Sequence, residues 1–190
     1  GSIEMMMRKS VRHVTHRAIE LYKTTKRGEF VLQHASMVVI AATQFWTAGI
    51  EAGLTENGYE GVKAYYETML GQLQELSYLV RTPLTKLQNK VLSALIVMEV
   101  HARDVVERLI EAEVSSTSDF EWVSQLRYYW EGTDSASTEL KDWGSRQELG
   151  DENLIVRMVQ CSYPYGYEYL GASSRLVVTP LTDRCYMTLM

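Results

Sequence analysis

The chain has 190 residues, 46% of them hydrophobic and 23% charged, which is typical of one or two globular domains with a substantial core. Nineteen basic and 24 acidic residues give a formal net charge of −5, without the concentrated basic face that binding to nucleic acid requires. No apolar run reaches the roughly 20 residues of a membrane span, and two cysteines are too few for a disulfide framework. We therefore expect a soluble protein of a reducing, cytoplasmic compartment, with no nucleic-acid or membrane partner.

The first third of the chain has mostly helical periodicity. Apolar residues recur every three to four positions over residues 3–26, which predicts an amphipathic helix. Residues 29–33 have a short strand-like pattern. Residues 36–52 are apolar over a broad arc and predict a well-buried helix. Gly53 and the pair Asn57-Gly58 are expected to lie in the connection to the next helix.

Two longer helices are predicted next. The first covers residues 59–80 and ends before Thr82-Pro83, because proline disfavours helix in the residue that precedes it. The second, over residues 84–114, has the longest and most regular helical pattern of the chain. Four helices joined by short loops are expected to form an antiparallel bundle, so the fold class is predicted to be mainly α.

The pattern changes after residue 115. Asp119 is expected to cap a short helix, and residues 126–130 are β-like. Residues 131–153 are polar, contain three glycines and predict a mobile loop. Residues 154–163 and 165–170 then alternate as two strands that could pair with residues 126–130. A small β-hairpin or strand region is therefore expected to follow the helical bundle.

Four alternating tyrosines, Tyr163, Tyr165, Tyr167 and Tyr169, are expected to project from one face of a strand. Such a row could stack on bases or sugars. Few basic residues accompany it, so packing against the helices or a neighbouring module is the favoured interpretation.

The C-terminal stretch combines an apolar strand with a turn at proline, over residues 176–181 (LVVTPL). This gives a flat, water-poor wall with backbone polar groups nearby, which an adenine ring requires. By composition alone, an ordinary buried strand and turn is the more common explanation. Thr182 and Asp183 form a good N-cap pair. The apolar helix that follows has no ending signal before Met190, so we expect the chain to be part of a longer protein.

Other candidate sites are weaker. His13 and His16 have a spacing that permits metal binding, but no further ligands match it and arginines flank the pair. Asp104 and Arg108 are spaced for a surface ion pair on a helix. No phosphate-binding G-x-x-x-x-G-K-[ST] loop is present, and nothing gives Glu51 or Glu168 a catalytic setting. We predict no catalytic residue and no metal site within the chain.

Several motifs resemble dynein heavy chains. Residues 165–171 (YGYEYLG) and 175–189 (RLVVTPLTDRCYMTL) are similar to the entry into the first AAA+ module. Upstream, residues 100–106 (VHARDVV) and 120–130 (FEWVSQLRYYW) resemble the end of the dynein linker. The matches occur in order and at familiar spacing, and the YGYEYLG form resembles axonemal rather than cytoplasmic dyneins.

The resemblance implies three regions. Residues 1–118 would be a helical bundle in the C-terminal part of the linker. Residues 119–170 would be a linker-to-ring junction, with the loop 131–153, and residues 171–190 the truncated start of the first AAA+ module, an α/β unit. The resemblance also implies that the adenine side of a nucleotide is lined by Leu176, Val177, Val178, Thr179, Pro180 and Leu181.

The parent chain is thereby implied to be an ATP-driven microtubule motor of the ciliary and flagellar axoneme, a cytoskeletal structure. Its implied cofactors are ATP or ADP with Mg²⁺, and none would be bound completely by this chain, because the phosphate loop is expected after Met190. Its implied partners are the rest of the AAA+ ring, microtubules bound through distant regions, and dynein light and intermediate chains. The alternative is a non-catalytic helical scaffold. A free-standing enzyme is disfavoured, because no nucleophile, base and orienting group can be assembled.

Overall fold

The computed structural model describes residues 2–33, 38–132, 152–168 and 179–189. Five helices form the first part of the chain: α1 (Ser2–Thr24), α2 (Arg27–Gln33), α3 (Val38–Asn57), α4 (Tyr59–Leu79) and α5 (Lys86–Glu111). A short helix, three strands and a last helix follow: α6 (Phe120–Val123), β1 (Arg127–Gly132), β2 (Glu152–Met158), β3 (Cys161–Pro164) and α8 (Pro180–Leu189). The mainly helical fold class with a small strand region is confirmed.

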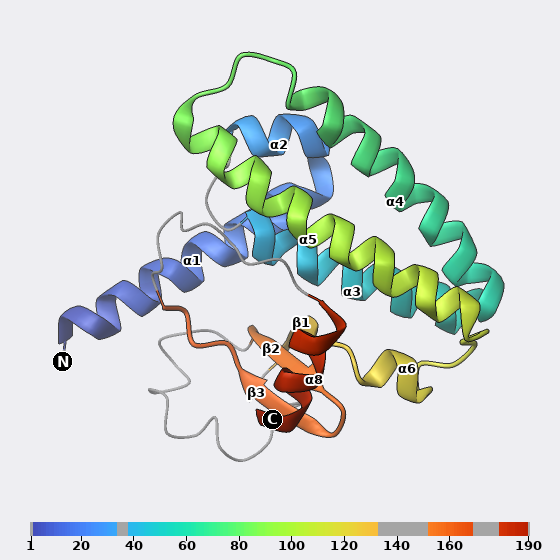
Figure 1. Ribbon diagram of the computed structural model, residues 1–190. Helices are drawn as coiled ribbons and strands as arrows, with labels where there is room; N and C mark the ends of the chain where they lie inside the picture. Colours follow the sequence, from blue (N-terminus) through green and yellow to red (C-terminus); the bar gives the residue numbers. More distant parts are fainter. Residues whose placement is uncertain (1, 34–37, 133–151, 169–178, 190) are drawn as a thin grey trace.

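Helices α3, α4 and α5 run back and forth beside one another, with α1 and α2 packed against them (Figure 1). The connection between α4 and α5 ends in a capping box, in which Thr85 accepts a hydrogen bond from the Gln88 amide and the Gln88 side chain accepts one from the Thr85 amide. This box fixes the start of α5, the longest helix at 26 residues.

The turn between α3 and α4 depends on glycine. Gly58 has a φ of 56°, a left-handed conformation that L side chains rarely adopt. The sequence predicted that the helix would end near Gly53. This residue instead lies within α3, where it faces Gly61 of α4. A Cβ atom on Gly61 would lie 2.0 Å from the carbonyl oxygen of Gly53. The two glycines therefore allow the helix backbones to approach closely.

The strand predicted over residues 29–33 was wrong, because this segment is part of helix α2. The neighbouring residues Phe30 and Val31 are both fully buried, which does not fit the alternation of a half-buried strand. The Phe30 amide donates to the carbonyl of Lys26 at 2.8 Å, as in a helical turn. Packing of α2 against α4 and α5 overrides the local strand preference.

The three strands form one antiparallel sheet in the order β1-β2-β3. Tyr128 pairs with Val156 on β2, which confirms the predicted pairing of the strand near residues 126–130. The strand predicted over residues 154–163 is instead a hairpin, since Met158 pairs with Cys161 across a turn at Val159 and Gln160. Residues 165–168 are not a strand, and most of the predicted loop 131–153 lies outside the described residues.

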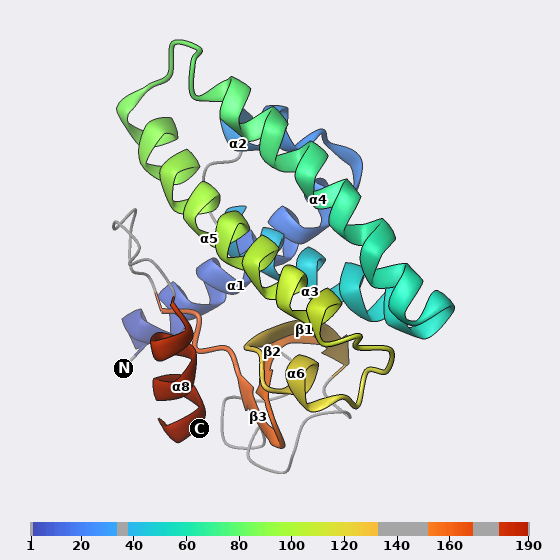
Figure 2. The same cartoon turned by 45° about the vertical axis from the view of Figure 1, so that its right-hand side comes forward.

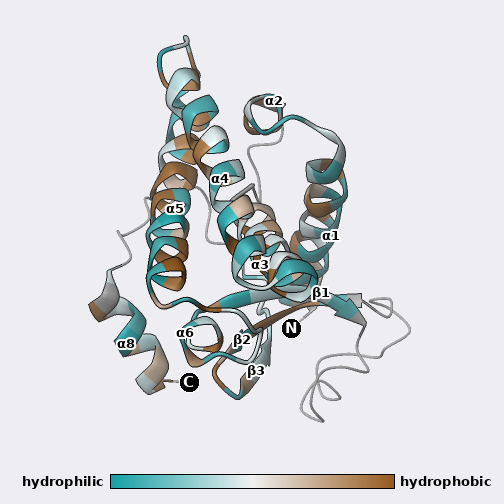
Figure 3. Ribbon diagram, turned by 90° about the vertical axis from the view of Figure 1, so that its right-hand side faces the viewer, coloured by the Kyte–Doolittle hydropathy of each residue, from teal (hydrophilic) through white to brown (hydrophobic). Residues whose placement is uncertain are grey.

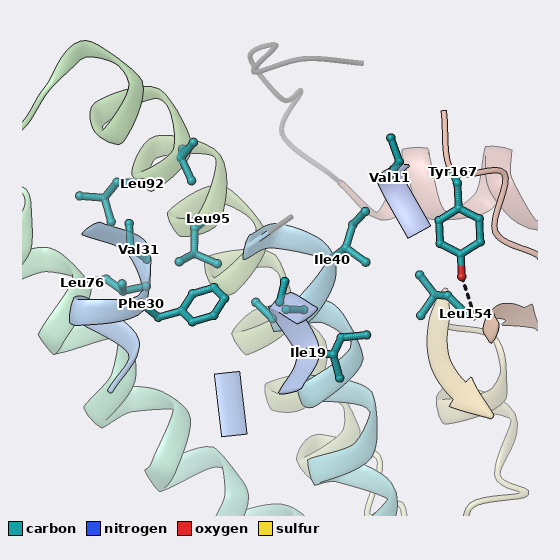
Figure 4. Close-up of a cluster of buried hydrophobic side chains, with 14 residues drawn as sticks. Val11, Ile19, Phe30, Val31, Ile40, Leu76, Leu92, Leu95, Leu154 and Tyr167 are labelled. Atoms are coloured by element: carbon teal, nitrogen blue, oxygen red, sulfur yellow. Dashed lines mark hydrogen bonds between the residues drawn. The ribbon is translucent and has the colours of Figure 1, made fainter. Parts of the chain in front are cut away.

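The sheet lies across the lower end of the helices, as Figures 1 and 2 show from two directions. Colouring by hydropathy shows apolar residues on the inward faces of the long helices (Figure 3). Two clusters of buried apolar residues form the core. One gathers side chains from α1 to α5 and also includes Leu154 of β2 and Tyr167 (Figure 4). The second joins α3, α4 and α5 to Trp122 of α6.

Among the described helices, none combines the length and the apolar content that crossing a membrane requires.

Candidate functional site

The candidate site is the junction at which the sheet, α6 and α8 meet the helical bundle. Of the residues predicted to line adenine, Leu176, Val177 and Val178 lie outside the described residues. Thr179 directly precedes α8, Pro180 is the first residue of this helix, and the Leu181 side chain is 70% exposed. The described part of the predicted wall is therefore the start of α8.

The first turn of α8 is closed by two threonines. The Thr182 amide donates to Oγ1 of Thr179 at 3.4 Å, and the Thr179 amide donates to Oγ1 of Thr182 at 3.3 Å. Thr179 is thus the cap, and Pro180 takes the first helical position, where proline is well tolerated. The predicted N-cap pair Thr182 and Asp183 was wrong, because both residues lie inside the helix.

Tyr167 anchors residues 165–168, which follow β3, to the core. Its side chain is 4% exposed, and its hydroxyl accepts a hydrogen bond from the Leu154 amide at 2.9 Å while donating to Oδ1 of Asn153. Burial raises the pKa of the Tyr167 hydroxyl to about 12. The residue has a φ of 47°, which is rare for a non-glycine residue. These contacts hold the backbone in one place at the edge of the bundle.

The predicted row of tyrosines on one strand face was wrong, because the chain leaves β3 at Pro164. Tyr163 is 44% exposed, whereas the rings of Tyr165 and Tyr167 pack edge to face at 5.3 Å. Tyr165 also contacts Tyr128 of β1, with 6.2 Å between the ring centroids. The packing interpretation therefore fits Tyr165 and Tyr167, and Tyr169 lies outside the described residues.

Glu51 of α3 is the centre of a polar cluster between this helix, α6 and β1. Its Oε1 accepts hydrogen bonds from the Tyr129 hydroxyl at 2.5 Å and from Nε1 of Trp122 at 3.3 Å. Nη1 of Arg127 lies 3.6 Å from the same oxygen. Burial, together with the bond to Glu51, raises the pKa of Tyr129, which keeps its hydroxyl protonated as a donor. One carboxylate thus joins α3 to both α6 and β1.

Further contacts join the sheet to the helices. The Tyr128 amide donates to Oγ1 of the fully buried Thr47 on α3 at 3.1 Å. Trp130 stacks on His16 of α1, with 5.2 Å between ring centroids and an interplanar angle of 11°. At the far end of the sheet, the Val159 amide donates to the carbonyl of Val123 at 2.7 Å. Ring stacking from α1 and hydrogen bonds from α3 and from Val123 of α6 therefore hold the sheet on the bundle.

A buried ion pair joins α2 to α5. Nη1 of Arg27 on α2 is 3.1 Å from Oε1 of Glu99 on α5, and both side chains are less than 8% exposed. Nε of Arg27 also donates to the Tyr22 hydroxyl at 2.5 Å. Burial raises the pKa of the Glu99 carboxyl, and the Arg27 charge opposes this effect. The pair fixes α2 against the middle of α5.

Asp119 and Asp104 differ in part from their predicted roles. Asp119 is the N-cap residue of α6, but its carboxylate accepts hydrogen bonds from the upstream amides of Ser115 and Ser116, at 2.9 and 3.0 Å. The predicted pair of Asp104 with Arg108 was wrong. Asp104 instead binds its neighbour Arg103, with Nη2 2.5 Å from Oδ1, because the Arg108 guanidinium extends towards α8.

Within the residues that the structure describes, no three or more His, Cys, Asp or Glu side chains are grouped so as to hold a metal ion. His16 is used in packing against Trp130. Among the described residues, the junction provides fixed hydrogen bonds and buried rings, which are features that position a segment.

Sequence reasoning missed the role of Glu51 and the partners of Asp183. Glu51 and Glu56 are the charged residues of the apolar helix α3, and an acidic residue on such a helix is a signal for a buried polar partner. For Asp183, the partners His101 and Arg108 are seven residues apart and share one face of α5. No local pattern indicates that this face meets α8.

Comparison with known proteins connects this geometry to one protein family. A family model described as "Hydrolytic ATP binding site of dynein motor region" matches residues 165–190, the segment that begins next to the buried Tyr167.

Similar proteins cover nearly the whole chain. Dynein axonemal heavy chain 1 of Rattus norvegicus is 43% identical over 188 residues, which is 98% of this chain and 4% of that protein. Dynein axonemal heavy chain 12 of Homo sapiens is 41% identical over 189 residues, 99% of this chain and 6% of that protein. Dynein axonemal heavy chain 3 of Homo sapiens is 40% identical over 189 residues, 99% of this chain and 4% of that protein. The chain spans only a small part of each relative.

Proposed function

Because the chain is a homologue of a segment of the axonemal dynein heavy chains, we propose that it is the region of an ATP-driven microtubule motor in which the linker joins the first AAA+ module. In this proposal, residues 1–118 are the last part of the linker, residues 119–170 the junction and residues 171–190 the start of the module. The parent motor would act in cilia or flagella.

The observation that carries the proposal is the position at which the ATP-site match begins. The match starts at Tyr165, and Tyr167 is buried in the same apolar cluster as residues of α1 to α5. The segment that leads to the nucleotide would therefore emerge directly from the core of the linker bundle. Close-packed interiors move as units and transmit small displacements. Such a connection suits the stiff root of a lever arm.

The nucleotide would be ATP or ADP with Mg²⁺, and this chain would supply the adenine side through residues 176–181. Leu181 offers an exposed apolar side chain at the start of α8. The Thr179 amide, in contrast, is already bonded to Thr182. We expect Leu181 to cover one face of the adenine ring. The phosphates would be held by other parts of the AAA+ ring.

The proposed partners are the rest of the AAA+ ring, microtubules bound through distant regions, and dynein light and intermediate chains. The formal net charge of −5 gives this chain no overall positive charge with which to attract an acidic filament. We therefore place the microtubule contact outside residues 1–190.

The proposal is tested with the full-length protein that contains this chain. We expect ATP hydrolysis that microtubules stimulate, and gliding of microtubules over the immobilised protein. Leu181→Ala should raise the KM for ATP several-fold, whereas Leu189→Ala, which changes another exposed leucine of α8, should leave it unchanged. A full-length protein that binds no ATP would contradict the proposal and favour a helical scaffold.

A further inference from the structure

Asp183, in the first turn of α8, lies between two side chains of α5. Its Oδ1 is 3.9 Å from Nε2 of His101, and its Oδ2 is 3.6 Å from Nη2 of Arg108. The Asp183 side chain is 16% exposed and the His101 side chain 17% exposed. Oδ2 is buried without a hydrogen bond in the described structure. A largely buried carboxylate thus lies between these two α5 side chains, and Arg108 is the one that is always charged.

The two α5 residues are arranged to hold one acidic group. They are two helical turns apart on the same helix face. Arg108 is steadied by a hydrogen bond from its Nε to the carbonyl of Asp104 at 3.4 Å. Burial lowers the pKa of His101 below its usual 6.5, which favours the neutral imidazole, so the permanent positive charge beside Asp183 is that of Arg108.

The apolar side chains of α8 point away from the bundle at several positions. Leu181 is 70%, Leu189 83% and Tyr186 38% exposed. Figure 3 shows α8 next to α5, on the side of the molecule away from α1, and its ion contacts are with residues 101 and 108 in the second half of α5. Within the described part of the chain, the polar contacts of Asp183 with α5 therefore contribute much of what holds α8 in place.

Helix α5 can carry this constraint through the bundle. Its 26 residues extend over roughly 39 Å at 1.5 Å per residue. The buried pair of Glu99 with Arg27 fixes it to α2, two residues before His101. The threonine cap closes the first turn of α8, so the position of Asp183 also determines where Thr179 and Leu181 lie.

We infer that Asp183 is a positioning residue that docks the first turn of α8 on His101 and Arg108 of α5. It gives the segment after residue 178 a second attachment to the bundle, in addition to the covalent connection through Tyr167. The consequence for ATP rests on the proposed function, since α8 would then be the helix that follows the adenine side. The inference that Asp183 docks α8 on α5 does not rest on nucleotide binding.

The docking is tested by hydrogen–deuterium exchange of peptides from α8 in the full-length protein. Asp183→Asn and Arg108→Asp should each speed exchange in residues 180–189 by about three- to tenfold, because partly buried charges lose their partners. The charge-exchanged double variant Arg108→Asp with Asp183→Arg should return exchange to within about twofold of the original protein. Lys90→Asp, an exposed change on α5, is the control.

Unchanged α8 exchange in both single variants would overturn the inference. So would a double variant that exchanges as fast as Arg108→Asp alone, because this result would indicate general damage to α5. A second measurement, the KM and kcat for ATP, separates the two proposals. Altered exchange in a protein without ATP binding would support the docking and contradict the motor function. ATP turnover with unaltered exchange in the variants would support the motor function and contradict the docking.

Discussion

The hydroxyl of Tyr129 on β1 donates a hydrogen bond to the carboxylate of Glu51 on α3, with 2.5 Å between the two oxygens. The bond joins residues 78 positions apart in the sequence and connects the sheet to the helical bundle. The same carboxylate oxygen also accepts from Trp122 of α6. A single side chain therefore contributes to the attachment of both elements that follow the long helices.

Replacing Glu51 tests this attachment. Glu51→Ala should lower the free energy of unfolding by about 2 kcal/mol, because the Tyr129 hydroxyl and the Trp122 N–H lose their acceptor. Glu51→Gln keeps an acceptor oxygen and should cost less than half as much. Urea denaturation measures both, with Glu56→Ala as the exposed control on α3. Equal losses for Ala and Gln would show that the acceptor is unimportant.

The close approach of α3 and α4 makes a second prediction. Gly61→Ala should destabilise the fold by about 3 kcal/mol or more, since the new Cβ would lie 2.0 Å from a backbone oxygen that cannot move aside easily. Gly71→Ala is the matched control on the same helix, because nothing lies within 4 Å of its Cβ position. This control should stabilise by up to about 1 kcal/mol through helix propensity. Thermal unfolding of a Gly61→Ala protein at the original temperature would contradict the packing.

The helices could be predicted because their signals are local. Apolar periodicity located α1, α3, α4 and α5, although α3 continues past Gly53. That glycine looked like a helix end, but its function is to let Gly61 approach, which depends on a residue of another helix. The helix α2 was missed for a similar reason, since seven residues are too few for periodicity to separate a helix from a strand.

The candidate site was harder to predict than the helices. The motifs of residues 165–189 indicated an ATP-associated segment, and the family match agrees with this position. The sequence does not reveal that Tyr167 bonds to the Leu154 amide or that Asp183 meets α5. Such contacts arise from tertiary packing between distant segments, which single-sequence patterns do not encode.

The Tyr167 hydroxyl offers a third prediction. Tyr167→Phe should cost about 1 kcal/mol of stability, because two hydrogen bonds of the buried hydroxyl are lost, the one from the Leu154 amide and the one to Asn153, although the Leu154 amide keeps the Asn153 side-chain oxygen as an acceptor. Tyr163→Phe makes the same chemical change at a 44% exposed ring and should have little effect. Chemical denaturation compares the two variants. A Tyr167→Phe protein as stable as the Tyr163→Phe protein would show that the hydroxyl does not anchor this segment.

A fourth prediction concerns pH. The backbone amides of Ser115 and Ser116 lower the pKa of Asp119 below its usual 3.8. A lowered folded-state pKa means that this stabilisation is present above pH 3.8 and is lost as the pH falls through the folded-state value. Asp119→Asn should therefore be less stable than the original protein at pH 7, and the difference should shrink in acid. A difference that is independent of pH would contradict this assignment.

In the proposed motor, the helical bundle and the sheet would move as one rigid body. We would measure it in the full-length protein by electron spin resonance, with labels at two exposed positions, Glu75 on α4 and Gln160 at the turn between β2 and β3. We predict one narrow distance distribution that is the same without nucleotide, with ADP and with a non-hydrolysable ATP analogue. A broad distribution, or a shift of more than about 5 Å between these states, would contradict the rigid connection.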